Sequence, residues 1–116
     1  MSTFAKYIFI NKQDFMLIFN TTYLVSDKVQ DAWLLWVREQ HIPFMLQFKP
    51  FSHPQVARVI PVEEQDGTSY SVQFHVLDLE TLGIWKERFG LAFQQNCAHE
   101  FGTEAIYFST VLDIIE

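Results

Sequence analysis

Hydrophobic and polar residues alternate along three stretches of the chain. Residues 15–25 carry β-branched and aromatic side chains on both alternate faces, which is typical of a strand with both faces at least partly covered. Residues 56–78 hold two alternating runs around an acidic turn with Asp66-Gly67, which predicts a β-hairpin. Residues 104–115 alternate again after Gly102, so we expect a final strand there.

Two other stretches repeat their apolar residues at helical spacing. Residues 26–41 place Trp33 and Trp36 on one stripe and their charged residues on the other, which predicts an amphipathic helix. A second helix is expected over residues 79–97, capped by Asp78. The order β-α-β-β-α-β predicts a ferredoxin-like α+β sandwich, a four-stranded antiparallel sheet with two helices on one face.

The segment His41-Ile42-Pro43 interrupts the first helical pattern. Proline disfavours a helical residue before it, so we expect the helix to stop or kink near His41 and a short second helical turn to begin at Pro43. Two roles are open for His41. It caps free carbonyl groups at the end of the helix, where its cationic form suits the helix dipole, or it lines a pocket at the end of the sheet.

Composition narrows the class of protein. The 116 residues fit one domain, and 49% of them are hydrophobic. The net charge of −6, without any basic stripe, argues against nucleic acid and against an anionic membrane surface as partners. The single cysteine, Cys97, cannot form an internal disulfide, and the N-terminus lacks the features of a signal peptide, so we expect a cytoplasmic protein.

Four sequence segments together resemble the DUF4286 family of small bacterial proteins of unknown function. They are MLIFNTTYLV from Met16, WLLWVREQHIP from Trp33, GTSYSVQF from Gly67 and FSTVLDII from Phe108. The family has an Arg before the Thr of its closing strand, where this chain has Ser109, so no role of that Arg carries over. The resemblance implies a fold of the dimeric α+β barrel type and a homodimer, but no activity.

Family members tend to begin where Met16 stands. We therefore interpret residues 1–15 as an N-terminal extension, or as the product of an upstream start codon, and residues 16–116 as the single domain. Within the extension, residues 4–10 have strand propensity. We expect them either to pair along a sheet edge, of the same chain or of a partner subunit, or to stay disordered.

One face of the predicted sheet gathers polar side chains. If Tyr70, Val72, Phe74 and Val76 face the helices, the polar alternates of the strands share the other face, and Arg58 joins them if the register allows. A dimer that stacks two such faces would enclose an apolar pocket with a few polar groups; alternatively, these groups pair with each other across the subunit interface. The candidate pocket residues are Asn20, Thr22, Gln73, His75, Tyr107 and Ser109.

No stretch of the sequence carries a recognised catalytic motif. The four histidines have no metal-ligand spacing, and neither a nucleophile elbow nor a phosphate-binding loop is present, so we predict no catalytic residue, metal or cofactor. The favoured function is a homodimeric, non-enzymatic binding or interaction module with a small-molecule ligand. The alternative is a cofactor-free enzyme resembling the dimeric α+β barrel monooxygenases, which would act on a small organic substrate.

Overall fold

Residues 16–116 are described by a computed structural model, and the predicted strand at residues 4–10 lies outside this range. Four strands, two main helical segments and two short 3₁₀ turns follow one another along it. In chain order they are β1 (Leu17–Val25), η1 (Asp27–Val29), α2 (Gln30–Trp36), the π-helical turn η2 (Val37–His41), α3 (Ile42–Leu46), β2 (Ser52–Val59), β3 (Thr68–Val76), α4 (Leu79–Phe101), η3 (Gly102–Glu104) and β4 (Ala105–Asp113).

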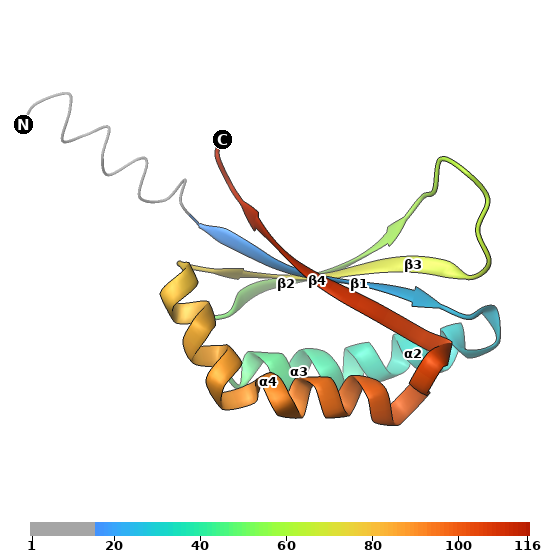
Figure 1. The fold of residues 1–116 in the computed structure, drawn as a ribbon, viewed down its shortest axis with the longest axis horizontal. Coiled ribbons are helices and arrows are strands. Elements are labelled where there is room, and N and C mark those ends of the chain that lie inside the picture. Colours follow the sequence, from blue (N-terminus) through green and yellow to red (C-terminus); the bar gives the residue numbers. More distant parts are fainter. Residues whose placement is uncertain (1–15) are drawn as a thin grey trace, which may run out of the picture.

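The four strands form one antiparallel sheet in the order β2-β3-β1-β4. Both helical segments lie on the same side of this sheet, as Figure 1 shows, so one face is covered and the other is open. The predicted order of elements and the predicted four-stranded sheet with two helices are confirmed.

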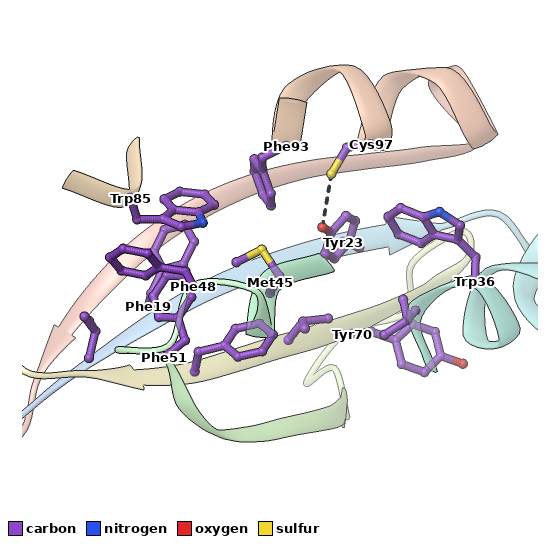
Figure 2. Packing of buried hydrophobic residues seen from close by; sticks show 14 of the residues in the cluster. Phe19, Tyr23, Trp36, Met45, Phe48, Phe51, Tyr70, Trp85, Phe93 and Cys97 are labelled. Carbon is purple, nitrogen blue, oxygen red and sulfur yellow. Dashed lines mark hydrogen bonds between the residues drawn. The ribbon is translucent and has the colours of Figure 1, made fainter. Parts of the chain in front are cut away.

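Aromatic side chains fill the space between the sheet and the helices. Phe19 of β1 lies at the centre of one cluster, with its ring centroid 5.1 Å from that of Trp85 and 6.1 Å from that of Phe51 (Figure 2). Tyr23, on the same strand face, packs against Trp33 at 5.1 Å. Burial of this aromatic area is the main favourable contribution to folding.

The helical path does not stop at His41, but its regular α-helical geometry is interrupted there, which fits the kink that was the other half of the prediction. Pro43 has no N–H, and its ring would clash with the carbonyl four residues earlier in a regular α-helix. The turn Val37–His41 is π-helical instead, and the N–H of Ile42 bonds to the carbonyl of Val37, five residues back. This wider turn accommodates the proline, and the predicted second helical turn is present as α3, which begins at Ile42, one residue before Pro43.

Both ends of α4 follow from side-chain chemistry. The Asp78 carboxylate accepts a hydrogen bond from the backbone N–H of Thr81 at 2.8 Å, which confirms the predicted cap. The helix continues to Phe101, four residues past the predicted end at Cys97, and stops at Gly102, whose φ is +54°. A positive φ suits glycine because it has no Cβ.

Candidate functional site

The candidate site is the open face of the sheet, which consists of the side chains that point away from the helices. The pairing of β1 with β3 and β4, and of β2 with β3, assigns each strand residue to one face. The open face comprises Ile18, Asn20, Thr22, Leu24, Gln55, Ala57, Val59, Ser69, Ser71, Gln73, His75, Ile106, Phe108, Thr110 and Leu112.

A hydrogen-bonded polar strip crosses the middle of the open face from β3 to β4. Gln73 Nε2 donates to Ser71 Oγ at 3.0 Å, and the Ser71 hydroxyl donates to Asn20 Oδ1. The Asn20 amide then donates to the hydroxyls of Thr22 at 3.1 Å and Thr110 at 3.2 Å. Asn20 and Ser71 are each only 8% exposed, so the strip is ordered by its neighbours even without a second layer above it.

Apolar side chains lie beside the polar strip. Phe108 is 60% exposed, and Ile106 and Leu112 of the same strand are also exposed. Near one end of the sheet, Leu24, Ile106 and Phe108 line a shallow groove of about 250 Å³, which Thr22, Ser69 and Tyr107 complete. The open face thus combines a polar centre with apolar surface, as binding sites for organic molecules commonly do.

Four of the six candidate pocket residues lie on the open face: Asn20, Thr22, Gln73 and His75. The placement of Tyr107 and Ser109 there is wrong, because β4 pairs them with Tyr23 and Thr21 on the covered face.

Tyr107 packs against Tyr23, with ring centroids 5.6 Å apart, and Ser109 Oγ lies 2.9 Å from Thr21 Oγ1. Arg58 is also on the other face, since it pairs with Tyr70.

Two members of the polar strip, Ser71 and Thr110, are not among the residues predicted from the sequence. The alternation of β3 predicts that Ser71 lies on the polar face, as it does. The same pattern holds for Ser69, so the sequence gives no reason to choose Ser71 as a site residue. Thr110 was missed because it alternates with Ile106, Phe108 and Leu112, an apolar set that a sequence pattern assigns to the core. The more apolar side of β4 instead faces away from the helices.

Two histidines meet where β2 borders β3. The rings of His53 and His75 stack with their centroids 4.7 Å apart, and His53 Nδ1 lies 2.9 Å from Ser52 Oγ. His53 has a φ of +53° at an irregularity in the register between Ser52 and Gln55. Within residues 16–116, no three His, Cys, Asp or Glu side chains are grouped so that they could hold a metal ion.

His41 lies in the helical layer, where the π-helical turn η2 passes directly into α3. Its side chain is 2% exposed, and burial lowers its pKa from 6.5 to about 4, so the imidazole is neutral at pH 7. Its Nε2 lies 3.3 Å from Tyr23 Oη, which in turn lies 3.3 Å from Cys97 Sγ (the latter contact is dashed in Figure 2). Burial also raises the pKa of the Cys97 thiol to about 11, so it stays protonated.

Neither role predicted for His41 describes its surroundings. It caps no carbonyl group, because Nε2 faces Tyr23 and Nδ1 has no hydrogen-bond partner among the described residues. It borders a small cavity of about 190 Å³, but this cavity lies between η2 and α4 and not at the end of the sheet. The ring stacks on Trp36 with centroids 4.8 Å apart, so His41 acts mainly as a member of the aromatic core.

Several solved structures share the architecture of this chain. An EthD (ethyl tert-butyl ether) family protein of Bacillus halodurans matches with a TM-score of 0.61 at 11% identity, over 81% of this chain and 96% of that one. A candidate antibiotic biosynthesis monooxygenase of Bacillus cereus matches with a TM-score of 0.59 at 14% identity, over 88% and 95%.

A dimeric ferredoxin-like protein from an uncultured marine organism matches with a TM-score of 0.57 at 13% identity, over 87% and 95% of the two chains. At these identities the likeness shows the fold alone. The chain has a ferredoxin-like fold of the dimeric α+β barrel type.

The family model described as a domain of unknown function, DUF4286, matches residues 16–115, so the chain belongs to this family. The resemblance seen in the sequence is thereby confirmed. No curated protein matches the sequence. Over the described part of the chain, none of the helices has the length and apolar character needed to cross a bilayer.

Proposed function

We propose that this protein is a homodimeric, non-enzymatic binding module whose two copies stack their open faces and enclose a pocket for a small organic molecule. The observation that carries this proposal is the absence of acidic side chains, lysine and arginine from the strand residues of the open face. None of its residues is Asp, Glu, Lys or Arg, whereas 19% of the whole chain is charged.

A face without charge suits contact between two copies of an acidic chain. Each copy carries a net charge of −6, so any charged contact between identical surfaces would bring repulsion or costly desolvation. Exposed apolar side chains on the same face, including Ile106, Phe108 and Leu112, gain free energy when a second layer covers them.

The polar strip is suited to lie inside such an interface. Buried polar groups need hydrogen-bond partners, and those of Asn20 and Ser71 are already satisfied within one copy. Thr22, Thr110 and Gln73 keep hydrogen-bonding capacity toward the second layer. A ligand or the partner copy would use this capacity.

The alternative is a cofactor-free enzyme resembling the dimeric α+β barrel monooxygenases, with Gln73 and His75 in a solvent-reachable cavity. No reacting group is favoured by geometry here: the covered-face position of Tyr107 removes one of the side chains on which this alternative depended. We therefore favour the binding module.

Sedimentation equilibrium tests the dimer directly. We expect the wild-type chain to be dimeric and Phe108→Asp to weaken the dimer at least about 100-fold, close to 3 kcal/mol, because a carboxylate would be buried without a partner. The matched control is Leu91→Asp on α4, since Leu91 is 68% exposed on the helical side and Phe108 is 60% exposed. Dissociation in both variants, or a monomeric wild type, would overturn the proposal.

A further inference from the structure

This inference rests on the proposed function and concerns the chemical class of the ligand at the open face. The hydroxyl groups of Thr22 and Thr110 both accept a hydrogen bond from the same Asn20 amide nitrogen, at 3.1 and 3.2 Å. Among residues 16–116 neither hydroxyl donates a hydrogen bond to the protein, so each keeps its O–H available.

The same direction of hydrogen bonding runs through the whole strip. Ser71 accepts from Gln73 Nε2 at 3.0 Å and donates to the Asn20 oxygen, and the Asn20 amide turns its N–H groups toward the threonines. Asn20 and Ser71 are buried, which holds this orientation. The strip therefore ends in two neighbouring hydroxyl donors that are preorganised before any ligand arrives.

Thr22 belongs to the polar strip and also lines the apolar groove, so the strip and the groove are adjacent. It pairs with Phe108 in the register of β1 and β4, and it lines the groove of about 250 Å³ together with Leu24 and Ile106. A molecule that places an oxygen at the two threonines can lay an apolar body in this groove. The groove alone holds less than a typical drug-sized pocket, and the stacked partner face would enlarge it.

The open face carries no Asp, Glu, Lys or Arg, and this composition selects against ions. A carboxylate or an ammonium group would lose its hydration there without meeting a counter-charge from any of these four residue types. We propose that the open face binds an uncharged organic molecule that carries a carbonyl or ether oxygen, with this oxygen accepting hydrogen bonds from the Thr22 and Thr110 hydroxyls and its apolar body in the groove of Leu24, Ile106 and Phe108.

Three probes of similar size and different charge test this assignment: acetophenone, benzoate and benzylamine. Each is titrated into the full-length protein by calorimetry or by ligand-observed NMR. We expect acetophenone to bind at least tenfold more tightly than either ion. The double variant Thr22→Val/Thr110→Val, which removes both hydroxyls at nearly constant shape, should weaken acetophenone binding about tenfold, a loss typical of one or two hydrogen bonds.

Two further variants separate loss of the donors from loss of the fold. Thr110→Ser keeps the hydroxyl and should keep the affinity for acetophenone within threefold of wild type. Thr103→Val, which lies in η3 outside the open face, should leave it unchanged. Circular dichroism of all variants verifies that they fold.

The inference is overturned if benzoate or benzylamine binds as well as acetophenone, if the double valine variant keeps full affinity, or if none of the three probes binds. The last result would mean that the polar strips of two copies pair with each other. Sedimentation of the same samples distinguishes this failure from that of the proposed function. A dimer without probe binding refutes only the ligand class, whereas a monomer refutes the dimer whatever the probes do.

Discussion

The two faces of the sheet belong to the same four strands, yet they differ in what covers them. On the covered face, Tyr23, Phe74 and Val76 are almost completely buried under the helices. On the open face of the same sheet, Ile106 and Phe108 are more than half exposed. The covered face is a closed core, whereas the open face exposes apolar side chains, a composition that commonly marks a surface for binding.

The comparison is clearest within β4, which lies at the edge of the sheet. Its covered side carries Ala105, Tyr107, Ser109, Val111 and Asp113, and its open side carries Ile106, Phe108, Thr110 and Leu112. The larger apolar surface therefore points away from the helices. A strand that contributed only to the core of one copy would be expected to show the opposite arrangement.

The largest expected effect is a difference in the free energy of unfolding between a phenylalanine removed from the covered face and one removed from the open face. Phe74→Ala on the covered face should lower the free energy of unfolding by about 3–5 kcal/mol, since it removes a buried aromatic ring and leaves a cavity. Phe108→Ala should cost less than about 1 kcal/mol, because its ring is already exposed in one copy. Urea unfolding followed by tryptophan fluorescence, at a concentration where the chain is monomeric, measures both. Equal losses would contradict the distinction between the faces.

A second, smaller effect concerns the neutral His41 beneath the covered face. Its pKa is about 4 in the folded chain and near 6.5 when unfolded, so between these values the unfolded state binds more protons. Stability that is present above pH 6.5 is therefore lost as the pH falls toward 4, by about 3 kcal/mol for this group.

Urea unfolding between pH 7.5 and 4 measures this loss. His41→Phe should flatten the pH dependence in that window, whereas His99→Gln, at an exposed position, should leave it as in wild type. An unchanged slope in His41→Phe would show that other groups set the pH dependence.

The smallest expected effect compares neighbours on β4 that point to opposite faces. Ser109→Ala should cost about 1 kcal/mol, because the buried Thr21 hydroxyl loses its partner at 2.9 Å. Thr110→Ala should cost less than about 0.5 kcal/mol in the monomer, since water can replace the hydroxyl that accepts from Asn20. Thermal or urea unfolding of the two variants measures the difference, and a larger loss for Thr110→Ala would reverse the assignment of faces.

Much of the fold could be predicted from the alternation and helical spacing of apolar residues. The strand at Tyr70–Val76 and the cap at Asp78 were predicted because local patterns determine them. The site was predicted only in part. Tyr107 and Ser109 were placed on the wrong face because the apolar set of β4 was assumed to face the helices, and only the pairing with β1 shows otherwise.

The π-helical turn before Pro43 illustrates a second limit of sequence reasoning. A proline in a helical pattern predicts a stop or a kink, and the local rule does not say that a wider turn will carry the helix past it. The packing of His41 against Trp36, Tyr23 and Phe93 depends on contacts between α2, η2, α4 and β1. Such contacts between distant segments leave no periodic signal in the sequence.

The most direct test of the central claim is isotope-filtered NMR on a mixture of ¹³C-labelled and unlabelled chains. It detects contacts between copies and names the side chains that make them. We expect intermolecular contacts from Ile106, Phe108 and Leu112 and none from Leu91 on the outer side of α4. Intermolecular contacts that come from α4, or none at concentrations in the millimolar range, would contradict the stacking of two open faces.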